Sequence, residues 1–247
     1  MKIGIIGGSG LEKLNIFNES EEVSFSTPYG KTSSTFFKGT TEKNEVYILS
    51  RHGRNHSLPP TQVNNRANIY AMKELGVDAI LATTACGSLR EKIGIGHLVF
   101  PDQIIDFTRH RDITFHEKFD KDQLGHISMA DPFDEKLRER LIREAQKLKT
   151  EYHPKGTMIT IEGPRFSTRA ESRMFQNWGA DIINMSIAPE VILANELSLP
   201  YAATAISTDY DSWKSDEEVT WQEVLKVFKS RVELVKELLS NTLTNMA

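Results

Sequence analysis

The chain has 247 residues, 39% of them hydrophobic and 26% charged, which is typical of a soluble globular protein. Its net charge of −4 and pI near 6.0 offer no basic surface, so neither nucleic acid nor a membrane is expected as a partner. The single cysteine, Cys86, excludes an intrachain disulfide and a cysteine-based zinc site. The opening MKIGIIGGSG does not read as a secretion signal, and no segment approaches the roughly 20 apolar residues of a membrane span. A cytoplasmic protein is therefore expected.

Apolar segments rich in β-branched residues alternate along the chain with segments of helical periodicity. Strands are expected at residues 2–7, 45–50, 77–84, 157–161, 181–185 and 201–207. Helices are expected at 61–75, at 133–149 after the cap Asp131-Pro132, at 168–178 after Thr168, and from Thr220 onward. In the last helix one stripe predicts a buried face: Trp221, Val224, Leu225, Phe228, Val232, Val235 and Leu239. This alternation predicts one α/β domain over residues 1–247, with a central mixed sheet flanked by helices.

The polar motifs fall where predicted strands end, which is where α/β folds bind ligands. The glycine-rich turn at residues 7–10 is not a dinucleotide fingerprint, because Lys13 stands where the third glycine belongs. Its N–H groups and the Ser9 hydroxyl can hold an anion, although a tight strand exit explains the glycines equally well. In SRHGRNHSLPP (50–60), Arg51 can donate two parallel hydrogen bonds to a phosphate, with a solvated basic loop as the alternative.

Three further motifs carry small polar or soft side chains at strand ends. The hydroxyl residues of TTACGSLR (83–90) let backbone amides approach a ligand, while Cys86 is interpreted as a packed small side chain. In TIEGPRFSTRAE (160–171), Phe166 beside Ser167 suits stacking on a planar ring, or a place in the core. In NMSIAPE (184–190), Met185 and Ser186 suit a sugar and a phosphate.

Two carboxylates follow the last predicted strand, in AISTDYDSW (205–213). If the strand continues, Asp209 and Asp211 point to the same face, because residues two apart in a strand share a face. A metal site, a turn and a solvated strand end are the simpler explanations.

Taken in order, these motifs resemble those of the trimeric purine nucleoside phosphorylase family, in particular its members that cleave 5′-methylthioadenosine. The resemblance covers nearly the whole chain and is carried by GIIGGSG, RHGRNH, TTACGSLRE, TIEGPRFSTRAES, WGADIINMS and TDYDSWK. It implies a pentosyltransferase of purine and methionine salvage, which reversibly converts 5′-methylthioadenosine and orthophosphate to adenine and 5-methylthioribose 1-phosphate. It also implies that no metal or organic cofactor takes part, and that the chain forms a homotrimer, or a hexamer of two trimers.

The resemblance assigns a role to each motif. The implied phosphate ligands are Ser9, Arg51, His52, Thr84 and Ser186. The implied nucleoside contacts are Ala85, Phe166, Ser167, Met185, Trp221 and Val224, with His126 lent across the trimer interface. Trp221 remains open at this point, because the helical stripe places it in the core and the family position places it in the pocket.

A mechanism for the acid pair follows from these assignments. Cleavage of the C1′–N9 bond leaves negative charge on the purine, so a proton donated to N7 helps the base to leave. Burial and the neighbouring charge raise a carboxyl pKa, and we expect Asp209 to be that acid, with Asp211 holding the arrangement. The alternatives are a phosphorylase of broader specificity, for which a 6-oxopurine enzyme would carry asparagine at position 209, a hydrolytic nucleosidase, and a non-catalytic nucleoside-binding protein.

Overall fold

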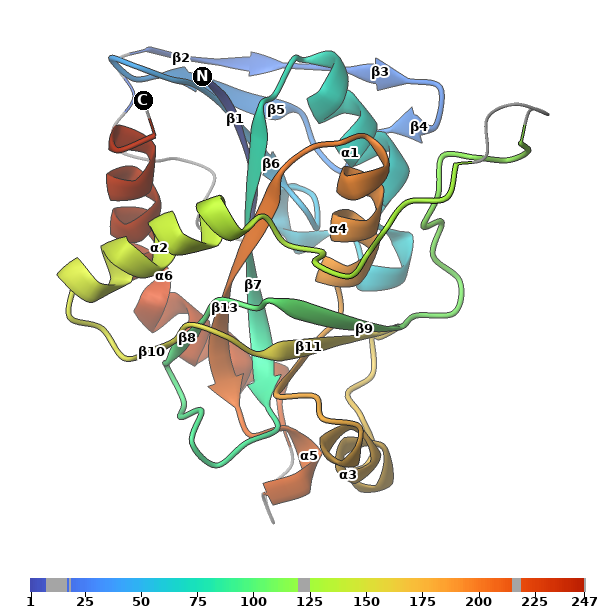
Figure 1. Cartoon of the computed structure of the whole chain (residues 1–247), viewed down its shortest axis with the longest axis vertical. Helices are drawn as coiled ribbons and strands as arrows, with labels where there is room; N and C mark the ends of the chain where they lie inside the picture. Colours follow the sequence, from blue (N-terminus) through green and yellow to red (C-terminus); the bar gives the residue numbers. More distant parts are fainter. Residues whose placement is uncertain (8–16, 18, 120–124, 215–218, 247) are drawn as a thin grey trace.

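The computed structural model describes residues 1–7, 17, 19–119, 125–214 and 219–246 (Figure 1). Within these ranges eleven strands form one mixed sheet. Its main path runs β10 (Tyr152–His153), β8 (Leu98–Val99), β13 (Tyr201–Asp209), β7 (Ala79–Ser88), β1 (Lys2–Gly7), β6 (Glu45–Ser50), β5 (Phe36–Thr40) and β2 (Glu19–Val23). A branch leaves β7 through β12 (Ile182–Asn184), β11 (Thr157–Ile161) and β9 (Gln103–Phe107). The short strands β3 (Ser26–Thr27) and β4 (Gly30–Lys31) pair separately.

Helices cover both faces of the sheet, as Figure 1 shows. One apolar cluster packs α1 (Asn65–Glu74) and α4 (Ile187–Glu196) on one face, and a second packs α2 (Glu135–Lys147) and α6 (Trp221–Thr244) on the other. Strand side chains alternate between the two clusters, since Ile6 belongs to the first and Ile5 to the second. The expected central mixed sheet flanked by helices is therefore confirmed.

Strand pairing on one edge of β7 is interrupted. Along this edge β1 pairs in parallel only as far as Ala82, and β12 pairs antiparallel at Gly87 and Ser88. On the other edge β13 pairs with β7 from Ile80 to Gly87. Among the described residues no strand pairs with the first edge between Thr83 and Cys86. The sheet thus opens at this point, at the carboxyl ends of β1, β6 and β13.

Most predicted elements are confirmed, with corrections at their ends. The strand expected at 77–84 is β7 and runs on to Ser88, because β13 and then β12 continue to pair with it. The helix expected from residue 133 begins later, since Asp134 rather than Asp131 caps α2 by accepting from Leu137 N. The helix expected at 61–75 is α1, preceded by a separate 3-10 turn, η2, at Pro60–Gln62.

The N-termini of the last two predicted helices have the caps that the sequence predicts. Thr168 and Glu171 form the expected capping box at α3 (Arg169–Asn177), and Thr220 accepts from Glu223 N at α6. One member of the predicted stripe of α6 is wrong as a core residue, because Trp221 is 46% exposed. The short strands β2, β5, β8, β9 and β10 and the helix α5 (Asp211–Lys214) were not predicted, since they carry no sustained apolar pattern.

The buried stripe of α6 is expected to hold the helix on the sheet. Leu239→Ala removes a fully buried side chain and should lower the free energy of unfolding by about 2–5 kcal/mol. Leu234→Ala, at a partly buried position of the same helix, is the matched control and should have a smaller effect. Urea unfolding followed by circular dichroism measures both, and equal effects would contradict the assignment of this face.

Candidate active site

A pocket lies where the pairing along β7 is interrupted. It collects residues from the ends of β6, β7, β11, β12 and β13 and from the first turns of α6. Twelve of the residues expected at the site line it: Arg51, His52, Thr84, Ala85, Phe166, Ser167, Met185, Ser186, Asp209, Asp211, Trp221 and Val224. Motifs far apart in the sequence thus meet in one cavity.

The two carboxylates come together differently from the sequence-based expectation. The register of β13 on β7 shifts between Ser207 and Asp209, and such irregularities are common beside active sites because they redirect side chains. Asp209 ends the strand, and Asp211 begins α5 with a φ of 49°, in the left-handed region that aspartate tolerates. Its backbone N–H donates to Asp209 Oδ1 at 2.8 Å. A sharp turn, rather than strand alternation, therefore brings the carboxylates into one pocket.

Burial dominates the chemistry of Asp209. It raises the pKa of this carboxyl from 3.8 to about 6, although hydrogen bonds from Thr208 Oγ1 and Asp211 N act in the opposite direction. The negative charges of Asp211 and Glu223 add smaller effects in the same direction as burial. Asp209 can thus carry a proton close to neutral pH, mainly because it is desolvated rather than because it has an acidic neighbour.

Asp211 is held on the protein side of the pocket. Its Oδ2 accepts from Ser167 Oγ at 2.5 Å, and Ser212 Oγ donates to the Ser167 carbonyl at 2.7 Å. Burial raises the pKa of Asp211 as well, against the hydrogen bond from Ser167. The α5 turn and the segment before α3 are therefore fastened to each other at this end of the pocket.

A glycine gives the acid pair its room. A Cβ placed on Gly87 would lie 2.9 Å from Asp209 Oδ1, 3.0 Å from Ile183 Cγ2 and 3.2 Å from Asp211 Cβ. Real Cβ atoms hardly ever approach other atoms so closely, so a larger residue would displace the carboxylates. The glycine of TTACGS thus permits the close approach of β7 to the turn that carries Asp209.

The opposite end of the pocket contains a buried arginine and several hydroxyl groups. Arg51, which follows β6, is 2% exposed and donates from Nε and Nη2 to Glu190 and from Nη1 to the Thr83 carbonyl. Thr84 Oγ1 and Ser186 Oγ lie 3.2 Å apart, and Ser186 precedes the first turn of α4 without capping it through its side chain. Ala188 N in the first turn of α4 already donates to Thr160 Oγ1, and Pro189 has no N–H, so the arginine and the two hydroxyl groups are the features that suit an anion here.

Three aromatic rings form one wall of the pocket. The rings of His52 and His56 have centroids 4.5 Å apart, and the rings of His56 and Trp221 have centroids 5.0 Å apart. His52 Nδ1 lies 3.0 Å from the Leu58 carbonyl, which only accepts, so Nδ1 carries the proton. Burial and the charge of Arg51 lower the pKa of His52 to about 4, so this imidazole is neutral at physiological pH with Nε2 as an acceptor.

Several pocket residues were missed from the sequence. Thr208, Asn184 and His56 line the pocket in addition to Thr83 and Gly87. Asn184 connects β12 to the neighbouring strand β11, since its Oδ1 accepts from Thr160 Oγ1 at 2.7 Å. His56 could have been predicted, because it belongs to the RHGRNH motif that follows a strand. Thr208 could not, because it looks like an ordinary strand residue.

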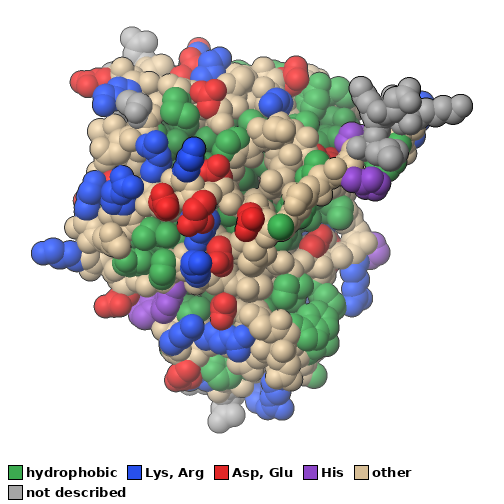
Figure 2. Space-filling view, in the orientation of Figure 1, with side chains coloured by type: hydrophobic (Ala, Val, Ile, Leu, Met, Phe, Trp, Pro, Cys, Tyr) green, Lys and Arg blue, Asp and Glu red, His purple; other side chains and the backbone are tan. Residues whose placement is uncertain are grey.

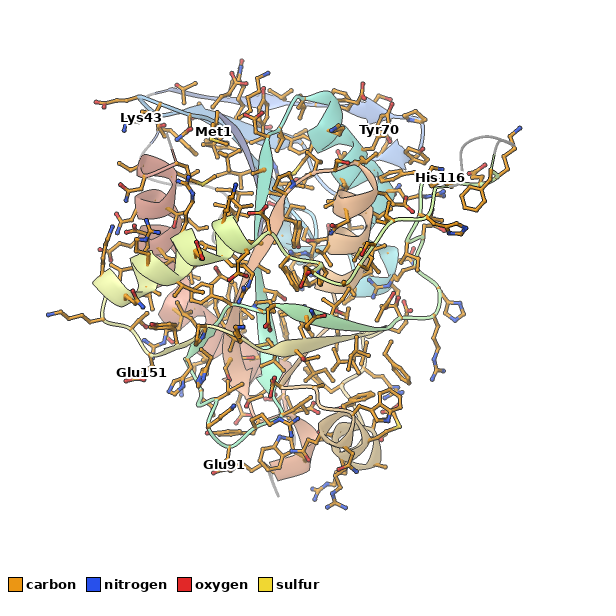
Figure 3. The ribbon with its side chains drawn as sticks, in the orientation of Figure 1. Met1, Lys43, Tyr70, Glu91, His116 and Glu151 are labelled. Carbon is orange, nitrogen blue, oxygen red and sulfur yellow. The ribbon has the colours of Figure 1, made fainter. Side chains whose placement is uncertain are left out.

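Two expected site residues remain. Ser9 lies outside the described residues. His126 is exposed, and its ring contacts Phe119 at a centroid distance of 5.3 Å. It belongs to the segment that leaves the body of the protein beyond β9, on which Figure 3 labels His116. Within its own chain His126 therefore does not reach the cavity.

The described residues contain no group of three or more histidine, cysteine, aspartate or glutamate side chains placed to hold a metal ion. Among the same residues, no helix has the length and apolar character needed to cross a membrane. On the face shown in Figure 2, acidic and basic side chains are intermixed over the described surface.

The fold and the pocket define an α/β protein with one cavity. One end of the cavity suits an anion, and the other end suits an apolar ring next to an acid whose pKa is raised to about 6. A family model for the phosphorylase superfamily matches residues 2–244. S-methyl-5′-thioadenosine phosphorylase from Caenorhabditis briggsae is 49% identical over 240 residues, which cover 96% of this chain and 84% of the relative. The protein of the same name from Danio rerio is 50% identical over 242 residues, covering 97% and 86%.

A solved structure, methylthioadenosine phosphorylase from Schistosoma mansoni in complex with adenine, superposes with a TM-score of 0.93 at 40% identity, covering 100% of this chain and 92% of that one. A mutant of that Schistosoma mansoni enzyme, described as an adenosine/methylthioadenosine phosphorylase, was solved in complex with methylthioadenosine. The chain belongs to the phosphorylase superfamily, in one family with these S-methyl-5′-thioadenosine phosphorylases.

The raised pKa of Asp209 predicts how stability depends on pH. Between pH 3.8 and about 6 the unfolded chain has lost the proton that the folded chain keeps, so the contribution of Asp209 to stability falls as pH rises. Asp209→Asn should therefore be more stable than the wild type above about pH 6, by about 1–3 kcal/mol, and the difference should shrink toward pH 4. Urea unfolding at a series of pH values measures this.

Glu171→Gln is a control of opposite sign. Arg165 lowers the pKa of Glu171 from 4.5 to about 2, so this glutamate stabilises the fold above its unfolded pKa and the contribution is lost as pH falls. The glutamine variant should be less stable than the wild type at neutral pH. If Asp209→Asn behaved like Glu171→Gln, the buried and protonated state of Asp209 would be wrong.

Proposed function

We propose that this protein catalyses the reversible phosphorolysis of 5′-methylthioadenosine to adenine and 5-methylthioribose 1-phosphate. Relatives about 50% identical over almost the whole chain carry this activity in their names, which supports the proposal. The observation that carries it here is one cavity with Asp209, whose pKa burial raises to about 6, at one end and Arg51 with the hydroxyls of Thr84 and Ser186 at the other. That separation suits a reaction in which a base leaves from one side of a sugar and an anion attacks from the other.

At the acid end, Asp209 donates its proton to N7 of the purine as the C1′–N9 bond breaks. The electron pair of that bond goes to the base, which leaves as neutral adenine because N7 has been protonated. Asp211, fixed by Ser167, holds the Asp209 carboxylate through its backbone N–H and accepts from the 6-amino group of adenine, directly or through water. Phe166 and Ser167 contact the base.

At the anion end, a phosphate oxygen bonds to C1′ as the base departs. Arg51, Thr84 and Ser186 donate to the phosphate, and Ser9 is assigned to the same group from the sequence. His52 offers Nε2 as an acceptor to a protonated phosphate oxygen, because its Nδ1–H faces the Leu58 carbonyl. The bound phosphate also places negative charge beside the positively charged ribose of the transition state. Orientation and electrostatics, rather than covalent catalysis by the protein, supply most of the acceleration.

Between these ends, the nucleoside lies against side chains of several elements. Met185 and the backbone at Ala85 face the ribose, while Trp221 and Val224 form the wall around the 5′ substituent. We assign to His126 a contact with the 5′ group of a second copy, in a homotrimer or a hexamer of two trimers. The exposed Phe119 and Ile127 beside it, 47% and 40% accessible, support a partner for this segment. Residues 1–247 act as one cytoplasmic phosphorylase domain in this proposal.

A second candidate function is a phosphorylase that also accepts adenosine. The named substrates of the Schistosoma mansoni neighbour favour it, and so does the exposure of Trp221, which leaves the 5′ wall in contact with water. A hydrolytic nucleosidase would not need an anion site, and a binding protein would not need a protonated acid.

Adenine release from methylthioadenosine with and without phosphate tests the proposal. The wild type should release adenine only when phosphate is present, and Asp209→Asn should lower kcat by about 10²-fold or more while phosphate binding persists. Asp78→Asn is a matched control. Asp78 directly precedes β7, at the end of this strand away from the pocket, so its substitution should leave the rate unchanged. Release without phosphate would indicate a nucleosidase, and tight binding without release would indicate a binding protein.

Trp221 is expected to set the 5′ preference. An indole beside the pocket contacts a thiomethyl group favourably, by about 0.3–1.5 kcal/mol, whereas a hydroxyl against the same wall loses water without gaining a partner. Trp221→Ala should therefore lower the kcat/KM ratio of methylthioadenosine to adenosine by about 10-fold. Because Trp221 is 46% exposed, the melting temperature should change little.

Trp178→Ala is the control for a large exposed indole, since Trp178 is 50% exposed and does not line the pocket. It should leave the substrate ratio unchanged. An unchanged ratio in Trp221→Ala, together with a large fall in melting temperature, would show that Trp221 supports the fold rather than the specificity.

A further inference from the structure

A fully buried carboxylate stands behind the anion end of the pocket. Glu190 lies in the first turn of α4, is 0% exposed and is not among the residues that line the cavity. Its Oε1 accepts from Arg51 Nε at 2.5 Å, and its Oε2 accepts from Arg51 Nη2 at 3.0 Å. The parallel donor pair that was expected to bind phosphate is thus occupied by Glu190.

The Arg51–Glu190 pair is fixed on two further sides. Arg51 Nη1 donates to the Thr83 carbonyl at 2.7 Å, at the start of the unpaired edge of β7. Tyr201, 1% exposed at the first residue of β13, donates to Glu190 Oε2 at 2.6 Å. Four elements therefore meet at one guanidinium: the end of β6, the edge of β7, the first turn of α4 and the start of β13.

This pattern of bonds decides which donors of Arg51 remain. A guanidinium has five N–H groups, and three are engaged by Glu190 and Thr83. One N–H remains on each terminal nitrogen. Since Arg51 itself lines the pocket, these two N–H groups are the ones available to an anion there. The orientation of the available donors is therefore set by residues that never touch the ligand.

We propose that Glu190, supported by Tyr201, is a positioning residue that aims the free N–H groups of Arg51 at phosphate. The inference rests on the proposed phosphate role of Arg51. It assigns to the glutamate of NMSIAPE and to the tyrosine that opens β13 a function in phosphate binding rather than in the fold alone. Tyr201 keeps its proton in this network, because burial and the charge of Glu190 raise its pKa well above 10.0.

Charge and orientation make opposite predictions for the removal of Glu190. If the carboxylate mattered only through its charge, its loss would leave Arg51 unneutralised and tighten the binding of an anion. If it matters by aiming the guanidinium, its loss weakens that binding, because the donors no longer hold a fixed direction. Glu190→Gln changes the charge with almost no change in size, and so separates the two effects.

The first experiment uses Tyr201→Phe, which removes one hydroxyl from the network. The phosphate KM should rise about 3- to 10-fold while the methylthioadenosine KM stays within about 2-fold of the wild type. Tyr47→Phe is the matched control, since Tyr47 is also buried and donates to a glutamate, Glu45, at the same 2.6 Å. It should leave both KM values unchanged. An equal phosphate KM in the wild type and Tyr201→Phe would overturn the role of Tyr201.

The second experiment measures binding without turnover. Phosphate should raise the melting temperature of the wild type by mass action, and Glu190→Gln should need about 10- to 100-fold more phosphate for the same shift. Tighter phosphate binding in Glu190→Gln would overturn the proposal in favour of charge alone, and unchanged binding would show a structural role. Should Glu190→Gln fail to fold, Tyr201→Phe decides the question.

The wild type separates this inference from the proposed function. Phosphate-dependent release of adenine by the wild type, with unaltered phosphate binding in both variants, would overturn only the positioning role. Adenine release that ignores phosphate would instead overturn the proposed function, and the positioning role would fall with it.

Discussion

The interruption of pairing along one edge of β7 is the constraint on which the rest of the site depends. β1 pairs with this strand up to Ala82 and β12 pairs from Gly87, so a backbone edge is left open inside an otherwise continuous sheet. Backbone N–H and C=O groups rarely remain unpaired in a protein interior, so such an edge needs other partners. The Thr83 carbonyl is bound by Arg51 and the Ala85 carbonyl accepts from Thr84 Oγ1, while the N–H groups of this stretch can meet a ligand or water in the pocket.

The same constraint explains why the acid is buried. β13 stays paired to β7 as far as Gly87, and the chain then turns sharply beyond Asp209, which places Asp211 beside the first carboxylate. The pocket that results excludes enough water to raise the pKa of Asp209 to about 6. The fold therefore loses stability at neutral pH to keep a proton available there, a trade that is common at active sites.

The sequence was sufficient to predict the strands and helices of the core, because their apolar periodicity is strong. It was also sufficient to predict that the motifs meet, because parallel strands bring their carboxyl ends to one edge of the sheet. Residue patterns alone could not reveal the interruption along β7, since TTACGS reads as a strand end and is in fact a strand paired on one edge. The prediction that Asp209 and Asp211 share one pocket is correct, but its reason, alternation along a strand, is wrong, because a turn brings them together. The partner of Arg51 was also beyond reach, because Glu190 is 139 residues away and looks like an ordinary first-turn glutamate.

The two ends of the pocket treat charge in opposite ways. Arg51 is paired with a carboxylate before any ligand arrives, whereas among the described residues Asp209 receives hydrogen bonds only from the Thr208 hydroxyl and the Asp211 amide. The Arg51–Glu190 pair is therefore neutral as a unit, and at the other end the raised pKa of Asp209, about 6, leaves a fraction of this carboxyl protonated and uncharged near neutral pH. A phosphate entering this pocket brings most of the negative charge at its end with it. The negative charge that stabilises the cationic ribose thus arrives with the nucleophile. Without phosphate this charge is absent, so the cleavage is favoured when phosphate, rather than water, can attack C1′.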